Sequence, residues 1–262
     1  MPFEVRDVTD LAGCRAVVDV QLDVWGRDAE TVPASLLVAS IKRGGILVGA
    51  WDGARLVGFV WSMPGTRHGQ PMQWSHMLGV RSEARGTGLG VALKRTQSAR
   101  AIAAGVDLIE WTFDPLQAAN AHLNLSSLGC VASEYRVNTY GEMSGPLHRG
   151  TPTDRLVAEW WLQRPREAAL VPATDAIAIV TGRAGDWMTS GMTRLDLSAP
   201  AIGIPVPPRF GEMQQHDTDL ALAWRRATRE VFLNYFERGY RAVGFVFDRH
   251  SGGGQYLLRR ST

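Results

Sequence analysis

Short segments of alternating apolar and polar residues are separated by segments in which apolar residues recur at helical spacing. Alternation with a period of two predicts strands, and a spacing of three or four predicts helices. The predicted strands are 3–8, 46–51, 55–61, 73–80, 106–113, 131–140 and 156–162. The predicted helices are 11–25, 33–43, 91–104 and 116–128. Up to residue 140 the order is β-α-α-β-β-β-α-β-α-β, and strand 156–162 follows it; this order predicts an α/β (α+β) fold.

Residues 163–262 follow a different pattern, because their first part is rich in proline and predicts loops. The elements predicted here are a strand at 176–180, a helix at 217–238 and strands at 241–247 and 255–258. We therefore predict a domain at 1–162 and a C-terminal α/β extension at 163–262 that packs on it. Gly239 after the long helix resembles Gly129 after helix 116–128, which leaves a degenerate repeat open.

The segment Arg85-Gly86-Thr87-Gly88-Leu89-Gly90 lies between a predicted strand and a predicted helix. Glycine loses more backbone entropy on folding than other residues, so three glycines indicate a close approach to the backbone. A helix N-terminus has unpaired N–H groups and a partial positive charge, which favours a phosphate ligand. Val91 and Ala92 follow Gly90, which fits neither a Walker loop nor a dinucleotide fingerprint.

The spacing Arg85-x-x-Gly88-x-Gly90 resembles the acyl-CoA pyrophosphate loop of the GNAT superfamily of N-acyltransferases. Leu78-Gly79-Val80 and Leu93 also match the family's pattern, as does the order of elements over residues 3–162. The resemblance implies the GNAT fold, in which helices flank a mixed, mostly antiparallel central sheet. An ordinary strand-to-helix turn is the alternative interpretation of the glycine segment.

The whole chain also resembles a less characterised GNAT subgroup with a long C-terminal extension. The segments that carry this resemblance are 111–116, 120–124 and 159–161. One position departs from the family's pattern: Leu125 stands four residues before Gly129, where the family has a tyrosine. That tyrosine often protonates the leaving CoA thiolate. Ser126, Ser127, Tyr135, Tyr140 and water are the candidate replacements, and no acid is needed if the thiolate leaves unaided.

The resemblance implies acyl-CoA, carrying acetyl or succinyl, as co-substrate and implies no metal. The residues expected to contact it are Leu78, Val80, Arg85, Gly86, Thr87, Gly88, Leu89, Gly90 and Asn120. The pyrophosphate is expected on the N–H groups of the glycine loop, and the pantetheine arm is expected to pair with strand 73–80. A surface position is the alternative interpretation of Asn120.

Gly79 within strand 73–80 predicts a β-bulge that frees an N–H for the thioester oxygen. The alternative is that Gly79 makes room for a neighbouring side chain.

His76 is the predicted catalytic base, since an amine nucleophile arrives mostly protonated and needs a base with a pKa near 7. Strand alternation places it on the face of Trp74 and Leu78. A member of the GNAT family has a histidine at the same spacing, to which a base role is assigned. A buried histidine bonded to a backbone carbonyl is the alternative. Glu110 and Asp114 are the next candidates, although Asp114 before a proline favours a turn.

Two further sets of residues are expected to have mainly structural roles. The tryptophans on predicted strands are expected in the core, with one or two lining the acceptor pocket. The arginines of helix 217–238 are expected on a solvated face, with an acidic substrate or the CoA 3′-phosphate as the alternative. These are Arg225, Arg226 and Arg229.

The composition changes this picture little. A net charge of +2 and 45% hydrophobic residues favour a soluble domain without nucleic acid or a membrane surface as partner. Cys14 and Cys130 lack the spacing of a metal site or a disulfide framework. No signal peptide or spanning segment is recognised, so we expect a cytoplasmic protein. A homodimer is compatible with the sequence.

These observations predict an acyl-CoA-dependent N-acyltransferase that transfers the acyl group directly to a small amine, such as an amino acid. A non-catalytic acyl-CoA-binding or sensing module is the alternative. A plain nucleotide-binding domain is a third interpretation.

Overall fold

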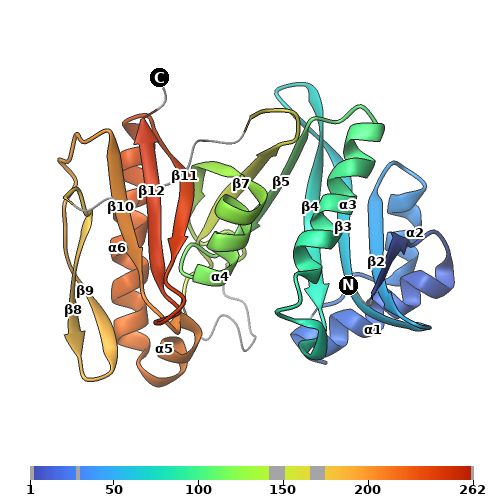
Figure 1. Ribbon diagram of the computed structural model, residues 1–262, viewed down its shortest axis with the longest axis horizontal. Coiled ribbons are helices and arrows are strands. Elements are labelled where there is room, and N and C mark those ends of the chain that lie inside the picture. Colours follow the sequence, from blue (N-terminus) through green and yellow to red (C-terminus); the bar gives the residue numbers. More distant parts are fainter. Residues whose placement is uncertain (1–2, 28–29, 142–150, 166–174, 261–262) are drawn as a thin grey trace. The chain divides into compact units, whose positions relative to one another are not determined.

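The chain folds as two compact units in a computed structural model that describes residues 3–27, 30–141, 151–165 and 175–260 (Figure 1). Unit 1 comprises residues 1–111 and 161–164, and unit 2 comprises residues 112–160 and 165–262. The compact units therefore divide near residue 111, whereas the predicted domain boundary lies at residue 162. Residues of the extension belong to the same unit as 112–160.

Unit 1 is built on a sheet with the strand order β1-β2-β3-β4-β5. The strands are β1 Glu4–Asp7, β2 Ile46–Asp52, β3 Arg55–Arg67, β4 Gln70–Val80 and β5 Leu108–Phe113, whose last two residues are counted in unit 2. All neighbours are antiparallel except β4 and β5, which are parallel. This confirms the predicted mixed, mostly antiparallel sheet.

Helices cover both faces of this sheet. They are α1 Leu11–Trp25, α2 Ala34–Ile41 and α3 Leu89–Ala103. On one face, Val17 of α1 and Leu37 of α2 pack with Phe59 and Trp61 of β3. On the other face, α3 lies along the sheet (Figure 1), where its Leu93 joins a second core cluster. Apolar side chains thus alternate between two helical layers, as the period of two predicts.

In unit 2 the strands follow the order β7-β6-β11-β12-β10. They are β6 Val131–Arg136, β10 Ala201–Val206, β11 Tyr240–Phe247, β12 Gly254–Arg260 and β7 Arg155–Trp161, whose last residue is counted in unit 1. The strands β8 Ile179–Ala184 and β9 Trp187–Thr193 form a separate hairpin. The helices are α4 Ala118–Ala121, the π-helical segment η2 His122–Leu128, α5 Phe210–His216 and α6 Thr218–Glu237. Helix α6 packs on β6 and β11, where its Phe232 stacks on Tyr135.

The segments that contain β6 and β11 in unit 2 share several local features. Gly129 before β6 and Gly239 before β11 both have a left-handed backbone, with φ of 78° and 82°. Ala132 and Ala242, each three residues after its glycine, pair with each other in antiparallel orientation. Each strand then pairs with the next in the chain, β6 with β7 and β11 with β12. The two segments thus share these local features, and the repeat that the sequence left open stays a prediction.

Several elements differ from the prediction: β9, β10 and α5 were not predicted, and the strand predicted at 176–180 is displaced to β8 Ile179–Ala184. The helix predicted at 116–128 is mainly π-helical, and there the hydroxyl of Ser126 donates to the carbonyl of Phe245 at 2.5 Å. This contact with β11 could not be seen in local periodicity. Strand β10 was not predicted because it contains Pro205, which lacks an N–H. Proline is tolerated there because β10 is the last strand of its sheet.

Candidate functional site

The glycine loop connects β4 to α3 in unit 1 and has an unusual backbone. Gly86 and Gly88 have φ of 76° and 83°, and Gly88 is the N-cap of α3. An added Cβ would meet no atom within 4 Å at either position. At Gly90 the nearest atom is Leu78 Cδ2 at 3.8 Å, an ordinary contact. Within the described part of the chain, the space beside Gly86 and Gly88 is therefore not filled by protein atoms.

The loop presents backbone donors rather than side chains. Among the described residues, no protein acceptor is found for the N–H groups of Gly86, Thr87 and Gly88, and no side chain caps α3. Thr87 donates its hydroxyl to the carbonyl of Ala84 at 2.8 Å, and Arg85 Nε donates to the carbonyl of Val80 at 3.0 Å. Both side chains thus fix the loop, and the N–H groups at the helix terminus remain available for an anion.

Strand β4 has an open edge next to this loop. Its pairing with β5 comprises Gln73 with Ile109 and Trp74 with Glu110. From Ser75 to Val80, no further pair with β5 is found in the described part of the chain. An extended ligand that carries amide groups could bind to this edge as an added strand does. Leu78 and Val80, predicted to bind the cofactor, lie on this segment.

The β-bulge of β4 lies at His76, and the prediction of a bulge at Gly79 was wrong. Trp61 of β3 pairs with Met77 and Ser62 pairs with Ser75, so His76 is the extra residue. Gly79 pairs regularly with Phe59, and an added Cβ would lie 2.9 Å from the Phe59 ring. Gly79 therefore makes room for a side chain, which was the alternative interpretation. The extra residue of a bulge leaves the ladder, so the free backbone polar groups are those at His76.

The bulge also changes where His76 lies. Its ring meets that of Trp61 edge to face, with centroids 5.4 Å apart. Met77 packs on the cluster that contains Trp61, whereas Leu78 packs on the opposite cluster. The prediction that His76 shares a face with Leu78 was therefore wrong, because the bulge interrupts the alternation. The side chain is exposed, and desolvation lowers its pKa from the ordinary value. His76 is thus neutral at pH 7 and able to accept a proton.

The other acid and base candidates have structural partners. Glu110 is buried and ion-paired with Arg67, so it does not face solvent. Asp114 accepts from the N–H of Leu116 at 2.9 Å, which supports the predicted turn. Burial and the Asp154 carboxylate raise the pKa of Tyr135, which donates to Asp154 at 2.7 Å. These groups are poor candidates for proton transfer.

The remaining candidates lie in unit 2. Tyr140 is hydrogen-bonded to Thr112 at 2.9 Å, and Ser126 bonds to the backbone of β11. Leu125, at the position of the expected tyrosine, is buried. Asn120 is exposed on α4, whereas the glycine loop, Leu78, Val80 and His76 belong to unit 1. The structure thus groups all predicted site residues except Asn120 within one unit.

The arginines of α6 were mostly misassigned to a solvated face. Arg225 is 1% exposed and donates two hydrogen bonds to Asp114, at 2.7 and 2.8 Å. Arg229 binds Asp154, which is fully buried, with two hydrogen bonds at 2.8 and 2.9 Å. Only Arg226 of the three is exposed. The sequence signal for this network was weak, because its partners are far apart along the chain.

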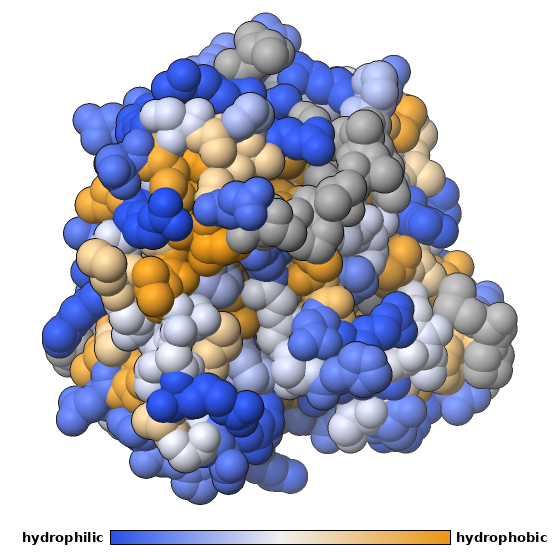
Figure 2. Space-filling view, turned by 60° about the vertical axis from the view of Figure 1, so that its left-hand side comes forward, coloured by the Kyte–Doolittle hydropathy of each residue, from blue (hydrophilic) through white to orange (hydrophobic). Residues whose placement is uncertain are grey.

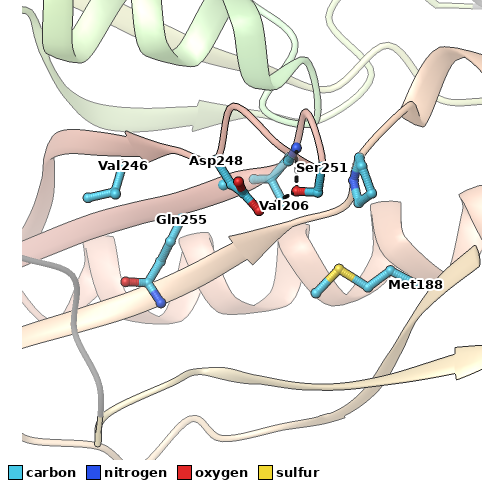
Figure 3. Close-up of a pocket in the computed structure, with 9 residues that line it drawn as sticks. Met188, Val206, Val246, Asp248, Ser251 and Gln255 are labelled. Carbon is cyan, nitrogen blue, oxygen red and sulfur yellow. Dashed lines mark hydrogen bonds between the residues drawn. The ribbon is translucent and has the colours of Figure 1, made fainter.

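A cavity of about 290 Å³ lies in unit 2 at the turn between β11 and β12 (Figure 3). The carboxylate of Asp248 lines this cavity and stabilises the turn through hydrogen bonds. Asp248 accepts from the hydroxyl of Ser251 at 2.6 Å and from the N–H of His250 at 2.9 Å. This cavity contains none of the predicted site residues.

The surface of the molecule shows apolar residues among hydrophilic ones (Figure 2). Met192 of β9 is 70% exposed, the most of the large apolar side chains described. Among the described residues, no group of three or more His, Cys, Asp or Glu side chains could hold a metal ion. None of the described helices is long and apolar enough to cross a membrane.

Comparisons with known proteins agree with the element order. No family model matches the chain, and no curated protein matches its sequence. Among solved structures, an acetyltransferase of the GNAT family from Streptococcus pneumoniae superposes with a TM-score of 0.51 at 14% identity, over 60% of this chain and 98% of its own. The Salmonella typhimurium protein yncA, assigned as an acetyltransferase and solved with its cofactor acetyl-CoA, superposes with a TM-score of 0.50 at 18% identity, over 64% and 98%. The chain therefore has the GNAT fold.

Proposed function

We propose that this chain, which has the GNAT fold, is an acyl-CoA-dependent N-acyltransferase that acts on the amine of a small molecule such as an amino acid. The observation that carries the proposal is the set of unpaired N–H groups at Gly86–Gly88 beside the open edge of β4. The two features suit the two parts of the co-substrate. The N–H groups suit the pyrophosphate, and the strand edge suits the amides of the pantetheine arm.

The roles of the remaining residues follow from this assignment. The backbone of Leu78 and Val80 would pair with the arm, which brings the thioester toward the bulge. His76, neutral at pH 7, would take the proton of the attacking amine. An unpaired backbone N–H at the bulge would donate to the thioester oxygen as it becomes negative. Acetyl is the acyl group we favour, and succinyl is the second candidate.

Gly90→Ala tests the binding of CoA without disturbing the fold. The new methyl has an ordinary contact with Leu78, and alanine is about 1 kcal/mol better than glycine within a helix. We expect unchanged or increased thermal stability, and affinity for CoA lower by about tenfold or more, or about 1.4 kcal/mol, by calorimetry. The control is Gly211→Ala at the second position of α5, which meets no atom within 4 Å and should leave CoA binding unchanged. Equal affinity in both variants would remove the loop from the binding site.

The transfer itself is tested by thiol release from acetyl-CoA and succinyl-CoA in the presence of a panel of amino acids and other small amines. We expect release above the hydrolysis rate for at least one acceptor. Tight CoA binding without release for any acceptor would favour the sensing module. Protection from heat by ATP or NAD, but not by CoA, would favour a plain nucleotide-binding domain. Failure to bind CoA would contradict both acyl-CoA interpretations.

A further inference from the structure

A buried lysine occupies the point where β4 and β5 part. The last pairs of these strands are Gln73 with Ile109 and Trp74 with Glu110, so Ser75 and Trp111 would form the next pair. Lys94 of α3 reaches this point instead. Its Nζ donates to Ser75 Oγ at 2.8 Å and lies 3.4 Å from the centroid of the Trp111 ring. The ammonium group thus lies between Ser75 of β4 and Trp111 of β5, where the pairing of the two strands ends.

The surroundings of this group indicate a role beyond packing. Lys94 is 2% exposed, and burying an ammonium group costs free energy that a methionine of similar size would not. Gln97, one turn further along α3, is fully buried, and its Oε1 accepts from Ser75 Oγ at 3.2 Å. Its Nε2 is buried and has no acceptor in the described part of the chain. A buried amide donor without a partner in this cluster points to an acceptor atom supplied by a ligand.

The direction of the open edge of β4 shows which ligand atom would come here. The edge begins next to the glycine loop at Val80 and ends at Ser75, five residues or about 17 Å away. A pantetheine arm held by its pyrophosphate at the loop would extend along this edge. Its thioester end would then approach Ser75 and Lys94.

We propose that the ammonium group of Lys94 contacts the sulfur of the bound co-substrate and stabilises the negative charge that this sulfur acquires. The inference rests on the proposed function. In the transfer, the amine nitrogen forms a bond to the carbonyl carbon, and the bond from that carbon to sulfur breaks. The electron pair of the broken bond stays on sulfur, and the proton of the amine goes to His76 and then to solvent. Lys94 thereby compensates for the absence of a tyrosine at Leu125.

The test is the thiol pKa of bound CoA, measured from the ultraviolet absorbance of the thiolate during a pH titration of the saturated complex. The reference is the thiol pKa of free CoA, measured in the same way. A neighbouring cation lowers the pKa of an acid by about one unit or more. We expect such a shift in the wild-type complex. In Lys94→Met, the pKa should return to the free value or rise above it, since burial without a cation favours the neutral thiol.

Two further variants distinguish the effect of the Lys94 charge from that of a change in structure. Lys94→Gln can keep a hydrogen bond to Ser75 but lacks the charge, and it should also abolish the shift. Lys42→Met removes the chain's other lysine, which is exposed at the end of α2, and should keep the shift. A wild-type thiol pKa equal to that of free CoA overturns the inference, even if both Lys94 variants fail to fold. A lowered pKa in a folded Lys94 variant that binds CoA also overturns it. Absence of CoA binding to the wild type, by calorimetry, instead contradicts the proposed function.

Discussion

His76→Gln is expected to lower kcat/KM for amine acylation by about 10²- to 10⁴-fold, the contribution typical of a positioned general base. Glutamine approximates the size and polarity of the ring but cannot accept a proton near neutral pH. The exposed position of His76 beside Trp61 favours retention of the fold in this variant. The measurement is kcat/KM for the best acceptor of the amine panel, together with thermal unfolding of both proteins.

The pH dependence of the wild-type enzyme should identify the same group. Because desolvation lowers the pKa of His76 from its ordinary value, the base is neutral at pH 7 and becomes protonated only in more acidic solution. Activity should therefore be present above about pH 6.5 and fall as the pH drops through the pKa of His76. This acidic limb should be absent from the residual activity of His76→Gln.

His250→Gln provides a matched control, since His250 is also exposed but lies in the turn after β11. It should keep wild-type activity. If His76→Gln stayed within about threefold of wild type at every pH, His76 would not be the base.

Arg225→Met is expected to destabilise unit 2 by about 3–5 kcal/mol, because it leaves the carboxylate of Asp114 without its buried partner. Methionine fills most of the volume, so loss of the charge and of two hydrogen bonds is the main change. The measurement is the free energy of unfolding in denaturant. Arg226→Met, at the exposed neighbouring position, should change it by less than about 0.5 kcal/mol.

The same pair gives a pH dependence of stability with a defined sign. Burial alone would raise the pKa of Asp114, but the charge and hydrogen bonds of Arg225 more than offset this and lower it. The contribution of the pair is therefore fully present above about pH 4, the ordinary range of an aspartate. It is lost as the pH falls through the lowered pKa of the folded protein. The assignment would be contradicted if Arg225→Met kept the acid-denaturation profile of the wild type. It would also be contradicted if Arg225→Met lowered the free energy of unfolding no more than Arg226→Met does.

The sequence was informative where local rules determine the structure. The glycine loop, helix α1 and strands β2 and β3 were all predicted from short stretches of adjacent residues. The resemblance to the GNAT family then implied the mixed sheet, and superposition on solved structures confirmed the fold.

The errors concern features that depend on distant partners. The bulge at His76 arises because β4 has one residue more than β3 between two paired positions. The sequence of β4 alone does not reveal this difference. Arg225 looked like part of a charged helix face because Asp114 is 111 positions away in the chain. Lys94 stands at a core position of α3, and only the parting of β4 and β5 shows why a charge is accommodated there.

The pairing of β6 with β11 has a consequence for the solubility of the protein. Without residues 240–260, β6 would form an edge of the sheet in unit 2 and expose unpaired backbone groups to other chains. Exposed edge strands promote aggregation, and proteins commonly protect them. Here the chain protects the edge with a strand from its own C-terminal part. Strands β11 and β12 of the extension therefore cover this edge of β6, although the proposed chemistry lies in the other unit.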